Sequence, residues 1–131
     1  MNYWHIQLHP NKMNWGVEEI RNILSQNLIG CSGKPIAEFY KIQKGDRVLV
    51  RHGAKVIALV EVIGSPKTTP ESIKNEWIWF TDCCEVEVLA YCENLSVKGK
   101  GWYLPTTLQQ IKKSNETAHS FIENLYNEIS K

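Results

Sequence analysis

The sequence lacks the features of several obvious functional classes. No apolar run approaches the roughly 18 residues of a membrane-spanning helix, and the N-terminus has no basic-then-apolar secretion signal. We therefore expect a cytoplasmic protein that makes no contact with a membrane. Lys and Arg number 15 against 14 Asp and Glu, so the formal net charge is only +1. A protein that binds DNA without specificity is usually far more basic.

Motifs of the common enzyme classes are also missing. There is no P-loop, no Gly-x-Ser-x-Gly turn, no His-Glu-x-x-His zinc motif and no dinucleotide-binding glycine run. Cys31 with His9 forms a nucleophile pair on paper, but no local motif supports it. We therefore expect no enzyme, no catalytic residues and no cofactor.

The cysteines show no metal-binding pattern. They are Cys31, Cys83, Cys84 and Cys92. These positions match no zinc-ribbon or zinc-finger spacing, and adjacent residues of a strand point to opposite faces. We expect reduced, structural thiols and no metal site; a zinc site or a disulfide is the alternative.

The chain is long enough to form one domain, and it is unusually rich in aromatic residues. A chain of 131 residues buries roughly two thirds of the surface that its unfolded form exposes. No repeat, low-complexity tract or linker divides it, so residues 1–131 form a single predicted domain. The 5 Trp and 5 Tyr either fill the core or line a recognition pocket.

Three helices are predicted, at about 15–28, 107–113 and 115–130. In the first and last, apolar residues recur at the spacing of an amphipathic helix. The short middle helix is expected because Thr106 and Gln109 have the spacing of a capping box.

The segment 45–64 predicts two strands joined at a corner, Arg51 to Ala54. Its second arm, 55–63, is apolar on both faces apart from Glu61, so both of its faces should be buried. The chain lacks the long helical crossovers that a parallel sheet needs. We expect an α+β fold: a small, closed or nearly closed β-barrel in which the inner face of 55–63 fills the barrel and the outer face takes a helix.

Three segments together resemble the EVE domain, a member of the PUA-like barrel superfamily. They are NYWHIQLHP, KGDRVLVRHGAKVIALVEVIGSP and EWIWF, and the likeness covers roughly residues 2–91. YTH domains, which read methylated adenine in RNA, belong to the same superfamily. Similar modules at the N-terminus of McrB-type restriction ATPases read modified bases in DNA. The resemblance implies a PUA-like barrel that binds a modified base.

The resemblance also implies where such a pocket would lie. In the superfamily it is formed by the end of the first strand (here 7–11), the loop after the first helix (here 30–33) and an aromatic beyond the hairpin. The family often has an aromatic or Asn in that loop, where this chain has Cys31 and Ser32; Trp15 compensates from the other side. The implied base pocket is His9, Asn11, Trp15, Cys31, Ser32, Trp77 and Trp79.

Each candidate also has a purely structural interpretation. Trp77 and Trp79 share a face if their segment is extended, and one or both then belong to the core, as we expect for Trp4. His9 is equally consistent with a surface histidine. The glycines of 30–33 are consistent with a simple helix end.

A local excess of positive charge lies between residues 34 and 55, where Lys and Arg outnumber the acidic residues Glu38 and Asp46. Such side chains hold nucleic-acid phosphates without specifying the sequence. The candidate phosphate contacts are Lys34, Arg51, His52 and Lys55. A solvated basic rim is the alternative.

The leading hypothesis is therefore a reader of DNA or RNA that binds a modified, most simply methylated, base flipped into an aromatic pocket. The chain would stand alone or be the specificity module of a restriction or RNA-modification system that includes an AAA+ ATPase or nuclease. One alternative is a PUA-like barrel used for protein–protein contact. Another is an enzyme acting on a nucleotide or small molecule.

Overall fold

The structure, a computed structural model, describes residues 1–8, 16–99 and 106–130. In chain order the elements are β1 (Tyr3–Gln7), α1 (Val17–Leu24), β2 (Leu28–Cys31), α2 (Ile36–Phe39), β3 (Arg47–His52), β4 (Lys55–Val62), β5 (Lys67–Thr68), a 3-10 turn (Glu71–Ile73), β6 (Asp82–Tyr91), β7 (Leu108–Ile111) and α3 (Glu116–Ile129). Among the described helices, none is long and apolar enough to cross a membrane.

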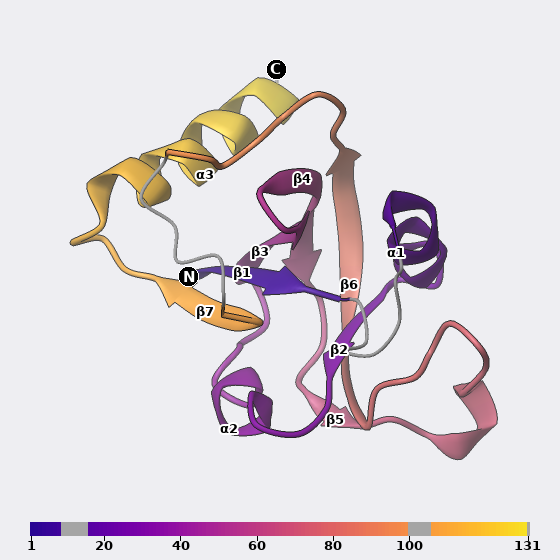
Figure 1. Ribbon diagram of the computed structural model, residues 1–131. Helices are drawn as coiled ribbons and strands as arrows, with labels where there is room; N and C mark the ends of the chain where they lie inside the picture. The colour runs from indigo at the N-terminus through magenta and orange to yellow at the C-terminus, as the bar shows by residue number, and fades with distance from the viewer. Residues whose placement is uncertain (9–15, 100–105, 131) are drawn as a thin grey trace.

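The strands form one curled, mixed sheet with the order β2-β6-β4-β3-β1-β7, and β5 pairs with β6 beside this path. Neighbouring strands are antiparallel except β1 and β3, which are parallel. The short helix α2 contacts both β2 and β7, the two ends of the strand order, and so bridges the opening of the half-barrel (Figure 1). The predicted α+β barrel with flanking helices is confirmed.

Strand β4 lies inside the sheet and is buried on both faces, as its apolar pattern predicted. Val60 belongs to the core cluster inside the barrel. Leu59, the next residue back, belongs to a second cluster outside it, which includes Ile122 of α3. Helix α3 lies along this outer side of the sheet (Figure 1). The strand therefore joins the two cores of the molecule.

Helix α3 forms where the apolar spacing predicted a helix over 115–130. The side chain of Asn115 accepts a hydrogen bond from the backbone N–H of Ala118 at 3.3 Å, which caps the N-terminus. Ala118 and Ile122 are the buried residues of its apolar face.

The helix predicted over 107–113 is wrong, because Leu108–Ile111 is strand β7, paired antiparallel with β1. Leu108 and Ile111 are spaced as on a helix, but in the strand they point to opposite faces. Leu108 enters the inner core cluster and Ile111 the outer one. As a strand, the segment fills two hydrophobic layers and pairs the edge of β1 that would otherwise be left open. These gains outweigh the local capping signal, which is weak.

Helix α1 is shorter than the predicted 15–28. It ends at Leu24, and Asn27 takes a left-handed backbone conformation with φ of 60° that turns the chain into β2. Leu28, the last residue of the predicted helix, begins the strand instead and pairs with Glu85. Asparagine is one of the few residues that adopt this conformation readily.

A buried carboxylate ties β1 to the turn before β3. Asp46 accepts hydrogen bonds from the indole Nε1 of Trp4 at 3.0 Å and from the backbone N–H groups of Asn2 and Gln43 at 2.8 and 3.0 Å. Trp4 is fully buried, so its predicted place in the core is confirmed. The Gly45-Asp46 turn therefore orients the first strand of the barrel.

Candidate functional site

A pocket of about 460 Å³ opens where the end of β1 approaches the loop after β2. Its size lies within the range of small-ligand sites. Segments distant in sequence form its walls: Gln7, Gly30, Cys31, Ser32, Gly33, Lys34, Pro35, Trp79 and Thr107. The structure thus brings together Cys31, Ser32 and Trp79 of the predicted base pocket. His9, Asn11 and Trp15 lie outside the described residues.

Trp79 supplies the aromatic ring of this pocket. Its indole Nε1 donates a hydrogen bond to the backbone carbonyl of Leu8 at 3.1 Å. Its ring meets that of Phe80 edge to face, with centroids 5.7 Å apart and an angle of 71° between the planes. Trp79 is only partly buried. An anchored, partly open indole is a surface on which a planar ring can stack.

Trp77 packs against the same inner core cluster as Trp79, but it is not among the described residues that line the pocket. Its backbone N–H and that of Ile78 both donate to Oδ1 of Asn75, at 2.8 and 2.9 Å. Ile78 is buried. This turn places the two Trp side chains in different surroundings, although they are two residues apart.

Ser32 is held by a chain of polar contacts behind the pocket. Its Oγ accepts a hydrogen bond from the backbone N–H of Thr81 at 2.8 Å. The carboxylate of Asp82 accepts from the hydroxyls of Thr81 and Tyr40 at 2.8 and 2.5 Å. The Asp82 hydrogen bond and burial raise the pKa of Tyr40, which keeps it protonated as the donor. Because Ser32 accepts from the backbone, its own hydroxyl hydrogen is left to donate to a ligand.

Cys31 contributes shape to the pocket rather than a reactive thiolate. Its side chain is almost fully buried. Burial, with a smaller effect from the charge of Asp82, raises the pKa of the Cys31 thiol to about 12. The thiolate is the nucleophilic form of cysteine, so this thiol is unreactive near neutral pH. The geometry gives no support to Cys31 as a nucleophile.

Gly30 is required by the close approach of Phe80. A Cβ built on Gly30 would lie 2.0 Å from Cδ2 of the Phe80 ring. Gly30 pairs with Cys83 across the β2–β6 ladder. The glycine therefore lets Phe80 fill the core directly beneath Trp79.

Arg51, predicted to contact phosphates from an exposed corner, is instead fully buried. It is the second-last residue of β3, because the hairpin turn contains only Gly53 and Ala54. Its Nε donates to Nδ1 of His5 at 2.8 Å. Its Nη1 donates to Oε1 of Gln7 and to the carbonyl of Gly53, at 3.0 and 3.2 Å. Its place inside the sheet corrects the prediction.

Arg51 instead supports the wall of the pocket. Nη2 donates to the carbonyl of Thr106, the neighbour of the lining residue Thr107. Gln7, a second lining residue, accepts at Oε1 from Arg51 and from the Gly53 N–H, the latter at 2.8 Å. Burial lowers the pKa of Arg51 to about 10, still well above neutral pH, so the guanidinium stays charged.

The other predicted phosphate contacts occupy different places. Lys34 is exposed at the rim of the pocket. His52 ends β3 at the hairpin and is partly buried. Lys55 begins β4 and lines a second pocket, which shares no lining residue with the pocket beside Trp79. The four predicted phosphate contacts therefore do not gather at one place: Arg51 is buried, and Lys34 and Lys55 line different pockets.

Five residues that line the pocket were not among the predicted site residues: Gln7, Gly30, Gly33, Pro35 and Thr107. Gln7 lay within the segment 7–11 that the resemblance singled out, but it was not chosen among the candidates. Thr107 was placed in a helix that does not form, so no sequence signal connected it with Ser32 or Trp79. Within the described residues no group of three or more His, Cys, Asp or Glu side chains is arranged to hold a metal ion.

Solved structures with the same fold include proteins with bound nucleic acid. A hypothetical protein from Leishmania major is 15% identical, with a TM-score of 0.62, and the match covers 100% of this chain and 98% of that one. The YTH domain of the Zygosaccharomyces rouxii MRB1 protein, in complex with N6-methyladenosine RNA, is 10% identical with a TM-score of 0.59, covering 92% and 85%. Human THYN1, in complex with DNA containing 5-methylcytosine, is 10% identical with a TM-score of 0.57, covering 95% and 97%.

At these identities the likeness shows the fold, and that fold is the PUA-like barrel. No family model matches the sequence, and a search of curated proteins finds no match.

Proposed function

We propose that this protein is a non-catalytic, EVE-like reader that binds a modified base of DNA or RNA, flipped into the pocket beside Trp79. The observation that carries the proposal is that pocket: an anchored, partly open indole faces a glycine-containing loop with a hydroxyl donor. A flipped base needs an aromatic surface to replace lost stacking and polar groups to recognise its edge.

Stacking on an aromatic side chain is worth about 1–3 kcal/mol per base, which offsets much of the cost of extrusion. Ser32 offers a hydroxyl donor, and the amide of Gln7 is oriented by Arg51 and Gly53. Two proteins of the same fold were solved with methylated RNA or methylated DNA. Base reading by this chain is consistent with both. We also propose that this chain is the specificity module of a restriction or RNA-modification system.

A panel of short, dye-labelled oligonucleotides tests it. Single-stranded RNA, single-stranded DNA and duplex DNA carry N6-methyladenine, 5-methylcytosine, 5-hydroxymethylcytosine or no modification, and binding is followed by fluorescence anisotropy at low salt. We expect at least one modification to bind about tenfold tighter than its unmodified control, a difference of about 1.4 kcal/mol. Equal affinity across the whole panel overturns the proposal and leaves the protein–protein barrel as the better interpretation.

A further inference from the structure

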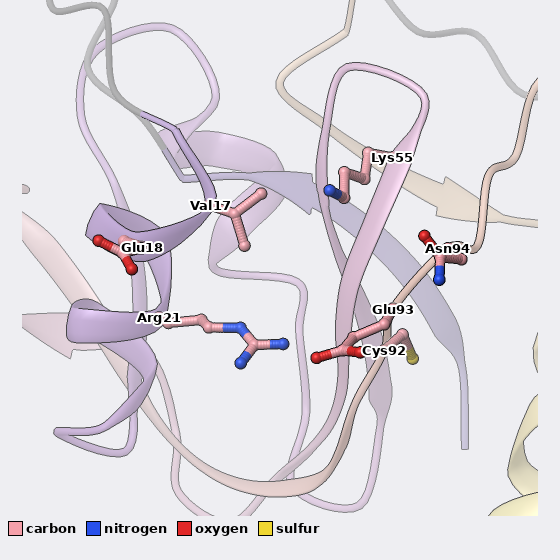
Figure 2. Close-up of a pocket in the computed structure, with 7 residues that line it drawn as sticks. All are labelled: Val17, Glu18, Arg21, Lys55, Cys92, Glu93 and Asn94. Carbon is pink, nitrogen blue, oxygen red and sulfur yellow. The ribbon is translucent and has the colours of Figure 1, made fainter.

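A second pocket, of about 330 Å³, lies between α1, the start of β4 and the segment after β6 (Figure 2). Its lining residues are Val17, Glu18, Arg21, Lys55, Cys92, Glu93 and Asn94. It shares no lining residue with the pocket beside Trp79. This second pocket has no role in the proposed base recognition and needs its own explanation.

Two cations from separate elements reach this pocket. Arg21 extends from α1 and Lys55 from the start of β4, and both side chains point into the space between these elements (Figure 2). Among the described residues, no carboxylate oxygen lies within 4.0 Å of a side-chain nitrogen of either one. The guanidinium of Arg21 lies over the ring of Tyr91, 4.8 Å from its centroid, which restricts its orientation. An oriented arginine and a lysine that line one pocket, both without a carboxylate partner within 4.0 Å, are suited to an anion.

Two glutamates also line this pocket. Glu18 points away from Lys55 and from the head of Arg21, whereas the carboxylate of Glu93 points toward the Arg21 guanidinium (Figure 2). Both glutamates are exposed to solvent. The lining therefore carries two cations and two solvated carboxylates, and because Glu18 is turned away, positive charge gathers at the heads of Arg21 and Lys55.

The hairpin corner connects this pocket with the one beside Trp79. Gln7, which lines the pocket beside Trp79, accepts a hydrogen bond from the backbone N–H of Gly53 at 2.8 Å. Lys55, which lines the second pocket, is only two residues beyond Gly53. A nucleic-acid strand whose base occupies the first pocket therefore has a short path over the corner to the second.

We infer that the second pocket binds a backbone phosphate of the same nucleic-acid strand, held by Arg21 and Lys55. The inference rests on the proposed function and adds to it how the strand lies on the protein. The base lies on the Trp79 side of the hairpin corner and the phosphate on the α1 side. Arg21 is then a nucleic-acid contact, although it lies outside the basic segment 34–55.

The test is the salt dependence of oligonucleotide binding. Each phosphate neutralised in a single strand contributes about −0.7 to the slope of log K against log salt. We expect the double variant Arg21→Gln, Lys55→Gln to lose about 0.7 of that slope and to bind about three- to tenfold more weakly near 50 mM salt. Its preference for the modified base should stay unchanged. The matched control, Lys112→Gln with Lys113→Gln, removes two exposed charges at the far end of β7 and should leave the slope unchanged.

Two further variants test the same phosphate site. Lys55→Gln alone leaves the Arg21–Tyr91 contact intact, so it should lower the slope even if the double variant folds poorly. Glu93→Gln should strengthen binding about two- to fivefold, since it removes the carboxylate that opposes the phosphate. If Glu93→Gln weakens binding, or if the slope of the double variant equals that of the wild type, the inference is wrong.

The outcomes also separate the inference from the proposed function. A wild-type protein that prefers a modified base, with an unchanged slope in the double variant, keeps the reader and removes the phosphate site. A wild-type protein without such a preference, whose slope falls in the double variant, removes the reader and keeps the phosphate site.

Discussion

Nε of Arg51 lies 2.8 Å from Nδ1 of His5, and this contact decides which nitrogen of the histidine carries the hydrogen. Because an arginine can only donate, Nδ1 must accept and the imidazole must be neutral with its hydrogen on Nε2. That hydrogen is directed to Oε1 of Gln109, 3.2 Å away. Burial, followed by the nearby charge of Arg51, lowers the pKa of His5 to about 4.

The neutral His5 makes stability depend on pH. An unfolded histidine has a pKa near 6.5, so between pH 6.5 and about 4 the unfolded chain binds a proton that the folded chain does not. The stabilisation is complete above pH 6.5 and is lost as the pH falls through this interval, by about 3 kcal/mol at most. Urea unfolding at several pH values measures it. His5→Gln should unfold more easily at pH 7 but with a shallower loss between pH 6.5 and 4.5; an identical pH dependence in both proteins contradicts the assignment.

Arg51 should behave as a structural residue. Arg51→Gln leaves acceptors on His5, Gln7 and Thr106 without their donor, and we expect a loss of about 3 kcal/mol in the free energy of unfolding. Lysine cannot reproduce the planar set of donors, so Arg51→Lys should lose nearly as much. Urea titration gives both values. A surface phosphate contact would produce the opposite result, in which stability is unchanged and only the salt slope of binding falls.

Substitutions of the two Trp residues of the segment 77–80 should have different effects on nucleic-acid binding. Trp79→Ala removes the ring that lines the pocket, and a loss of about 1–3 kcal/mol corresponds to roughly 5- to 150-fold weaker binding of the preferred oligonucleotide. Trp77→Ala should lower the melting temperature but leave the affinity of the folded protein within about twofold, because Trp77 packs against the core without lining the pocket. Anisotropy titrations of both variants, after thermal melting, provide the comparison. Equal effects on affinity would place the base elsewhere.

Gly30→Ala should disturb the pocket from beneath. The added methyl meets the Phe80 ring, and overpacking of this kind costs about 1–3 kcal/mol. Since the Phe80 ring contacts Trp79, we also expect the fluorescence of Trp79 to change. Gly64→Ala is the matched control, because its methyl would come no closer than 3.5 Å to Glu85. Phe80→Leu in the Gly30→Ala background should recover part of the lost stability; failure of this rescue would mean that the clash is not the cause.

Much of the fold could be predicted because its signals are local. The doubly apolar strand over 55–63 and the apolar face of the last helix are properties of short segments, and both are confirmed by the core clusters on the two sides of β4. The segment 107–113 was mistaken because a spacing of three residues suits both one face of a helix and two faces of a strand. The strand was selected by two tertiary features: pairing with the edge of β1 and burial in the two hydrophobic layers.

The sequence by itself determined a barrel-forming pattern, a supply of aromatic residues and the segments that carry Ser32 and Trp79. The tertiary structure alone decided that Trp79 and not Trp77 lines the pocket, and that Arg51 is a buried support for Gln7. Burial of an arginine depends on acceptors that other strands and loops supply, here His5, Gln7 and Thr106. Those partners lie 46, 44 and 55 residues away in the sequence, so no local pattern reveals them.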